Sequence, residues 1–216
     1  MQRQDLLIGA LAVSSLLAVA GCASLPSSDE LDRQSLAMHK ASFSARGIAT
    51  MDRLDQDLGQ RACSSDKAPS DALAKQIETE ALASIKWPTG GQYIGDWREG
   101  EKLAQNGRGL TWSESSAATS ANGGSCYNCH QIGKHELSYG SIGPSLYNYG
   151  KLRGVKNVTD PASAAIVQYT WGKLWNSKAY AACSDMPRFG HAKVLDEGQI
   201  RNIMALLLDP NSPVNQ

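Results

Sequence analysis

Cys126-Tyr127-Asn128-Cys129-His130 is the stretch that decides the fold and chemistry of this 216-residue chain. Two thiols three residues apart on a helical turn reach the two vinyl groups at one edge of a porphyrin, and the histidine that follows lies beneath the iron. The motif therefore predicts one covalent haem c on Cys126 and Cys129, with His130 as an axial iron ligand. A redox dithiol or half of a zinc site uses similar residues. Zinc, however, needs a second ligand pair at short spacing, and the sequence has none.

The second axial ligand has four candidates downstream of the motif: Met186, Met204, His135 and His191. Met204 falls on the apolar face of a predicted helix, and His135 lies close to His130 on the same side of the haem. Met186 precedes a proline, which holds the chain extended, and a glycine follows shortly after. We therefore predict Met186 as the ligand, with His191 as the alternative. Iron whose two axial positions are both filled by protein has no site for a substrate, so this haem would transfer electrons.

Gly143-Pro144 follows the haem motif and offers a backbone carbonyl near His130. The Pro144 carbonyl could accept the proton of His130 Nδ1 and fix the ring, as the partners of metal-bound histidines commonly do. An ordinary turn explains the same two residues equally well. The sequence leaves both interpretations open.

The first 21 residues have the pattern of an export signal. Arg3 precedes an apolar stretch, residues 6–20, that is short for a membrane span. The stretch runs into Leu17-Ala18-Val19-Ala20-Gly21-Cys22, which resembles a bacterial lipobox. We therefore predict cleavage before Cys22, lipid on its thiol, and a periplasmic protein whose lipid anchor is its one attachment to a bacterial membrane. A signal peptide cleaved elsewhere is the alternative.

Two of the five cysteines remain after these assignments, Cys63 and Cys183. The periplasm is oxidising, so we predict a disulfide between them that joins the N-terminal segment to the haem-binding body. Two buried thiols are the alternative. Closing so long a loop stabilises a fold by about 4–5 kcal/mol in the chain-entropy account.

The pattern of apolar residues predicts an all-α protein with long loops. Its expected parts are a signal peptide, a polar tether, a helical extension and a haem domain: residues 1–21, 22–34, 35–90 and 91–216. Ser70 is the expected N-cap of a helix that ends near Lys86. A second helix is expected over residues 95–105. Asp196 and Gln199 form a predicted capping box at the start of the last helix, which Pro210 stops.

The charge balance excludes a strongly basic nucleic-acid binder, because 21 basic residues balance 21 acidic ones. The distribution is uneven, since Lys and Arg outnumber Asp and Glu between Cys126 and Lys193. Chance scatter explains this excess. A basic rim around a haem edge, which would guide an acidic partner, explains it as well.

Stretches on both sides of the haem motif are also distinctive. They are Gly95-Asp96-Trp97, Gly100-Glu101, Asn106-Gly107-Arg108-Gly109, Gly143-Pro144-Ser145-Leu146, Tyr149-Gly150-Lys151-Leu152-Arg153-Gly154, Ala182-Cys183-Ser184-Asp185-Met186-Pro187-Arg188-Phe189-Gly190 and Leu206-Leu207-Leu208-Asp209-Pro210-Asn211-Ser212-Pro213-Val214-Asn215. With the haem motif, they resemble the SoxX family, the monohaem cytochromes of the bacterial sulfur-oxidation (Sox) system. The resemblance covers about residues 85 to 216. The lipobox departs from the family, whose members are soluble periplasmic subunits.

The resemblance implies a class I cytochrome c fold and a heterodimer with SoxA, a second c-type cytochrome. It further implies a complex that joins thiosulfate oxidatively to a cysteine of the carrier SoxYZ, as an L-cysteine S-thiosulfotransferase. The catalytic haem then belongs to SoxA, and this chain is the electron-transfer subunit, with no catalytic residue of its own and SoxYZ as a transient partner. Forming the S–S bond releases two electrons and one haem holds one, so a downstream acceptor is also needed. A stand-alone, membrane-tethered electron carrier is the alternative.

Overall fold

The structure is a computed structural model that describes residues 25–216. The predicted signal peptide and the predicted lipid site, Cys22, lie outside the described residues. The chain divides into two units, one that ends at Ser44 and one that spans Ala45–Gln216. In the described part, no helix combines the length and the apolar character that a membrane crossing requires.

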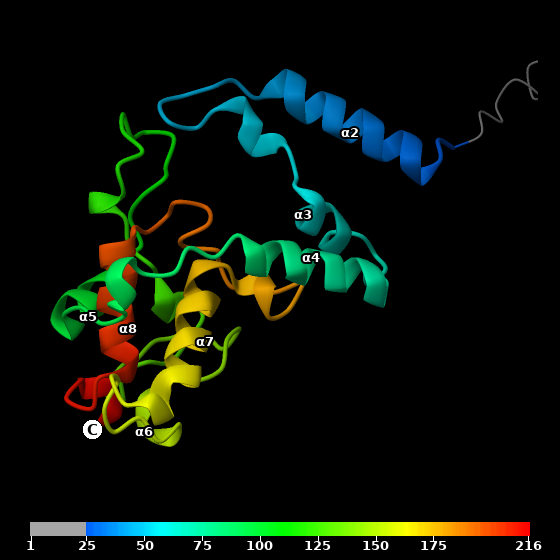
Figure 1. Cartoon of the computed structure of the whole chain (residues 1–216). Coiled ribbons are helices and arrows are strands. Elements are labelled where there is room, and N and C mark those ends of the chain that lie inside the picture. The colour runs from blue at the N-terminus through cyan, green and yellow to red at the C-terminus, as the bar shows by residue number, and fades with distance from the viewer. Residues whose placement is uncertain (1–24) are drawn as a thin grey trace, which may run out of the picture. The chain divides into compact units, whose positions relative to one another are not determined.

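The described part of the first unit contains helix α2, Ser28–Ser42 (Figure 1). Ser27 caps it, because its hydroxyl oxygen accepts a hydrogen bond from the Glu30 backbone N–H at 3.3 Å. Asp29 and Glu30 lie in the first turn, where negative charge favours a helix. Residues 28–34, expected in an irregular tether, are therefore helical. Their polar composition suits a capped, solvated helix as well as a linker.

The second unit is built from short helices and long loops, coloured from cyan to red in Figure 1. Its α-helices are α3 (Leu58–Cys63), α4 (Asp71–Ala83), α5 (Trp97–Gln105), α6 (Tyr149–Leu152), α7 (Ala164–Trp175) and α8 (Glu197–Leu208). Turns of 3₁₀-helix are Met51–Leu54, Thr89–Gly91, Thr119–Ala121, Cys126–Asn128, Pro161–Ser163, Ser177–Ala179 and Pro213–Asn215. No sheet forms among residues 25–216, where an isolated antiparallel bridge joins Arg46 and Ala49. The all-α prediction is confirmed for the described residues.

The predicted caps are present where the sequence placed them. The Ser70 hydroxyl accepts a hydrogen bond from Leu73 N–H at 3.4 Å at the start of α4, although this helix ends at Ala83, before the expected Lys86. At the start of α8, the Asp196 carboxylate accepts from Gln199 N–H at 2.8 Å and the Gln199 side chain accepts from Asp196 N–H at 3.0 Å. The capping box is confirmed.

Helices α5, α7 and α8 form the framework of the second unit. Helix α8 packs against both α5 and α7, so the buried core lies between them (Figure 1). The core side chains that α7 and α8 contribute are Val167, Trp171, Leu174, Trp175, Ile200, Ile203, Met204, Leu207 and Leu208. Helix α5 can approach α8 closely because Gly100 has no side chain: a Cβ there would lie 2.7 Å from the Asn202 carbonyl carbon.

Helices α3 and α4 belong to the same compact unit as the Cys-Tyr-Asn-Cys-His motif and not to a separate extension. Ile77, Ala81 and Ile85 are buried, and α4 packs on the 3₁₀ turn Ser177–Ala179. The compact unit therefore begins at Ala45, and no boundary lies at the expected position between residues 90 and 91. The apolar stripe of α4 was visible in the sequence, but its partner surface, far along the chain, was not.

We expect substitution of Trp171, a core residue, to lower the stability of the fold strongly. It is fully buried, its indole N–H donates to the Lys86 carbonyl at 2.9 Å, and its ring lies edge-on to Tyr93. Trp171→Phe should lower the free energy of unfolding by about 2–3 kcal/mol, because it leaves a void and removes the hydrogen bond to the Lys86 carbonyl. Urea unfolding measures this. Trp87→Phe, at a position 47% exposed, is the control and should change stability by about 0.5 kcal/mol or less. Equal losses for the two would contradict the assignment.

Candidate functional site

A cavity of about 460 Å³ opens in the second unit beside the Cys-Tyr-Asn-Cys-His motif. Its walls come from the motif, the loop at residues 142–146, α7, α8 and the loop at residues 184–189. Apolar side chains such as Ile132, Leu146, Leu174 and Leu206 predominate in its lining. This volume falls within the range of about 300–1,000 Å³ that cofactor sites occupy.

The two motif cysteines face this cavity together. They lie at the ends of one tight turn, in which the Cys129 and His130 backbone N–H groups donate to the Cys126 carbonyl at 3.1 and 2.9 Å. Both carry free thiols, and both line the cavity. Burial raises the pKa of the Cys126 thiol to about 12, so this thiol is uncharged at neutral pH.

His130 lines the same cavity, and a hydrogen bond to the backbone fixes its ring. Its Nδ1 lies 2.7 Å from the Pro144 carbonyl oxygen. A carbonyl can only accept, so Nδ1 carries the proton and donates it. Nε2 then keeps its lone pair, which is the state that a metal-binding imidazole requires. Gly143 allows this arrangement, since a Cβ at residue 143 would lie 2.5 Å from Nδ1 and 2.7 Å from Nε2.

The structure separates the four candidates for the second ligand. Met186 lines the cavity. Met204 does not line the cavity, because its side chain is fully buried in the hydrophobic core that α8 forms with its neighbours. His135 and His191 are exposed and are absent from the cavity wall. Burial lowers the pKa of His191, with the neighbouring Arg188 acting in the same direction and Asp57 opposing.

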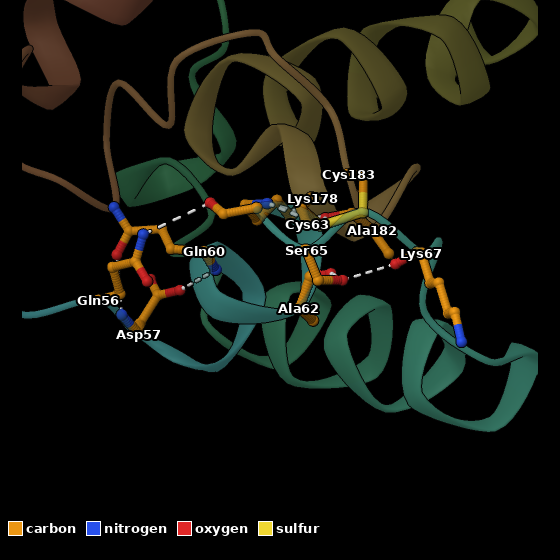
Figure 2. Close-up of a disulfide and its surroundings, with 11 residues drawn as sticks. Gln56, Asp57, Gln60, Ala62, Cys63, Ser65, Lys67, Lys178, Ala182 and Cys183 are labelled. Atoms are coloured by element: carbon orange, nitrogen blue, oxygen red, sulfur yellow. Dashed lines mark hydrogen bonds between the residues drawn. A yellow bond between two sulfur atoms is a disulfide. The ribbon is translucent and has the colours of Figure 1, made fainter. Parts of the chain in front are cut away.

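A disulfide, a hydrogen bond and an ion pair fix the loop that carries Met186. A disulfide joins Cys183 to Cys63 at the end of α3 (Figure 2). The Ser177 hydroxyl donates to the Met186 carbonyl at 2.5 Å, and Arg188 pairs with Asp57 at 2.6 Å. These contacts give Met186 a fixed position relative to α3 and α7.

Other cavity residues were not identified from the sequence. They include Arg153, Tyr169, Thr170, Lys173 and Leu174. The Arg153 guanidinium lies 3.8 Å from the Tyr149 ring centroid, and burial lowers the pKa of Lys173. Helix α7, which holds most of these residues, was not predicted. The sequence does contain a pattern that indicates this helix. The residues of one helical face recur every three or four positions, as do Val167, Thr170, Trp171 and Leu174.

The residues around this cavity fit a covalently attached haem. Two thiols, an imidazole and a thioether all line one mainly apolar space, which is the donor set of a His/Met c-type site. The imidazole also has its Nδ1 bound to a backbone carbonyl, as metal-binding histidines require. Among residues 25–216, no cluster of three or more His, Cys, Asp and Glu side chains is placed to hold a metal ion.

Comparison with known proteins identifies a relative of this chain. No protein-family model matches the chain. An uncharacterized lipoprotein of Aquifex aeolicus (strain VF5) is 37% identical over 167 residues, which cover 74% of this chain and 73% of the relative. Identity at this level over most of both proteins means a shared fold and common descent. The chain therefore belongs to the family of this Aquifex lipoprotein.

Proposed function

We propose that this chain is a periplasmic c-type cytochrome that binds one haem and transfers electrons. One observation carries the proposal: the Cys126 and Cys129 thiols, the His130 imidazole and the Met186 thioether line a single apolar cavity. Each of the four supplies a group that haem c attachment or ligation uses. The all-α architecture, with α5 and α8 packed together beside the cavity, agrees with a class I cytochrome c fold.

The chain's own residues have separate roles in this proposal. Haem c, when bound, supplies one-electron redox chemistry at its iron. Cys126 and Cys129 would hold the haem covalently, and His130 and Met186 would supply the two protein ligands of its iron. Pro144 fixes the tautomer and orientation of His130 through the contact at 2.7 Å. Apolar walls such as Ile132 and Leu206 exclude water, which favours a stable redox centre over a reactive one.

We further propose that the chain acts within a SoxAX-type complex, as the electron-transfer subunit of an L-cysteine S-thiosulfotransferase. The stretches that resemble SoxX support this assignment, and they include both the ligand loop and the C-terminal Leu206–Asn215. A SoxA-type cytochrome is then the heterodimer partner and SoxYZ the transient one. Lipid on Cys22 would hold the complex at a membrane surface, and the name of the Aquifex relative supports this anchor.

A purified holoprotein tests both levels of the proposal. Coexpression with a haem maturation system should give a chain whose mass increases by one haem, and whose reduced form does not bind carbon monoxide. Copurification with a second c-type cytochrome, and haem reduction that depends on thiosulfate and the full enzyme system, would support the complex. A colourless chain would refute the cytochrome assignment. A haem-loaded chain that binds carbon monoxide without mutation would refute Met186 as the second ligand and, with it, the electron-transfer role. A haem-loaded monomer that thiosulfate never reduces would refute the Sox assignment and favour a stand-alone carrier.

A further inference from the structure

The Cys63–Cys183 disulfide has an unusual neighbour, the ammonium group of Lys178. Lys178 Nζ lies 3.8 Å from Cys63 Sγ and donates a hydrogen bond to the Ala182 carbonyl at 2.9 Å. The side chain is buried, with 9% of its surface exposed. Figure 2 shows it lying against the sulfur bridge.

Among residues 25–216, no carboxylate lies within ion-pair distance of this ammonium. A nearby ion pair joins Arg188 to Asp57, at 2.6 Å. Burial lowers the pKa of Lys178, and Arg188 acts in the same direction, whereas Asp57 and Asp185 act more weakly against it. A buried cation is costly without a compensating anion. In the oxidised state the neighbouring Cys63 Sγ carries no charge that could compensate it.

Reduction of the disulfide would supply the missing anion. A thiolate on Cys63 would lie beside Lys178, and a neighbouring cation lowers the pKa of a cysteine. The Ala182 carbonyl, 3.5 Å from Cys63 Sγ, would repel a thiolate, but the same ammonium already binds this oxygen. A disulfide whose reduced form is stabilised in this way is more easily reduced, and its low-pKa sulfur is the better leaving group.

The two sulfurs also differ in access. Cys183 is exposed, whereas Cys63, the last residue of α3, is partly buried beside Lys178. We propose that Cys63–Cys183 is an exchange-active disulfide, opened by a dithiol that attacks Cys183 while Cys63 departs as a thiolate stabilised by Lys178. This proposal does not depend on haem binding.

The exchange balances without a further reactant. One thiolate of the dithiol forms a bond to Cys183 Sγ, the Cys63–Cys183 bond breaks, and its electron pair leaves on Cys63. The second thiolate then closes a disulfide within the reagent and displaces Cys183, which takes a proton from solvent. The chain gains two electrons and the dithiol loses two. Because Cys183 precedes Met186 by three residues, the reaction also removes the covalent tie between α3 and the Met186 loop.

Redox equilibration of the full chain tests the role of Lys178. Mixtures of reduced and oxidised dithiothreitol at neutral pH, followed by acid quenching, alkylation and peptide mass spectrometry, give the equilibrium for Cys63 and Cys183 apart from the other cysteines. Lys178→Met should shift the equilibrium toward the disulfide by about tenfold, equal to about 30 mV for a two-electron couple, and should slow reduction. Lys178→Arg keeps the charge and should stay near wild type.

Lys67→Met is the matched control, because Lys67 is exposed and points away from the sulfur bridge (Figure 2). It should leave both the equilibrium and the rate unchanged. An equal effect of Lys67→Met and Lys178→Met, or a wild-type disulfide that opens only in denaturant, would overturn the proposal. Glutathione gives a test that needs no variant: a mixed disulfide on Cys183 supports the assignment, and one on Cys63 refutes it.

Discussion

Replacing Met186 with Ala is expected to free one axial position of the haem and to lower its reduction potential. A thioether stabilises ferrous iron, and axial ligands together set potentials over a range of about 0.8 V, so losing this ligand should move the midpoint by a sizeable part of that range. The reduced variant should bind carbon monoxide, which the wild type should not. Redox titration and absorbance spectra with and without carbon monoxide measure both effects.

Met204→Ala is the informative comparison for this experiment. Met204 is the other methionine that sequence reasoning weighed, but it is fully buried in α8 and does not line the cavity. Its replacement should cost about 2–5 kcal/mol of stability, as large-to-small core substitutions do, and should leave the ligand spectrum unchanged in the protein that folds. A spectrum altered by Met204→Ala and untouched by Met186→Ala would transfer the ligand role to Met204.

The parts of this protein that local chemistry determines were predictable. Ser70 and the Asp196–Gln199 pair are caps, and a cap is a relation between residues three apart. The Cys-Tyr-Asn-Cys-His motif is equally local, and Met186 could be singled out because its neighbouring proline keeps it out of a helix.

Features that depend on distant packing were not predictable in the same way. Helix α7 buries Val167, Thr170 and Trp171 on one face, but several exposed positions on the other side are also apolar, namely Ala164, Ala165 and Tyr169, so the contrast by which an amphipathic helix is recognised is weak. Residues 45–90 belong to the second unit because α4 packs on the turn Ser177–Ala179, about a hundred residues later in the chain, and because Ile48 and Arg53 donate hydrogen bonds to the carbonyls of Glu114 and Leu110. For the same reason the sequence did not place Arg153 and Lys173 at one cavity, nor Lys178 beside Cys63.

The contact between Gly143 and His130 leads to the second large expected effect. Gly143→Ala places a methyl group 2.5 Å from Nδ1 and 2.7 Å from Nε2 of the imidazole, well inside contact distance. The ring cannot yield without losing its hydrogen bond to the Pro144 carbonyl, and the Gly143 backbone cannot yield without losing its own bond to the Cys129 carbonyl at 2.8 Å. The first movement displaces the His130 ring directly, and the second shifts the adjacent Pro144 carbonyl that orients this ring. We therefore expect most of the variant to lack a properly ligated haem, with the loss seen as a low ratio of haem absorbance to protein.

A glycine in an open environment separates this effect from the general cost of adding a methyl group. Gly198 lies in the first turn of α8, where the nearest atom to an added Cβ is 3.4 Å away. Gly198→Ala should keep full haem content and raise the free energy of unfolding by about 0.4–1 kcal/mol, because alanine has less conformational freedom to lose on folding. Normal haem content and an unchanged spectrum in Gly143→Ala would mean that the imidazole can move without penalty, and the role given to Pro144 in orienting it would then be wrong.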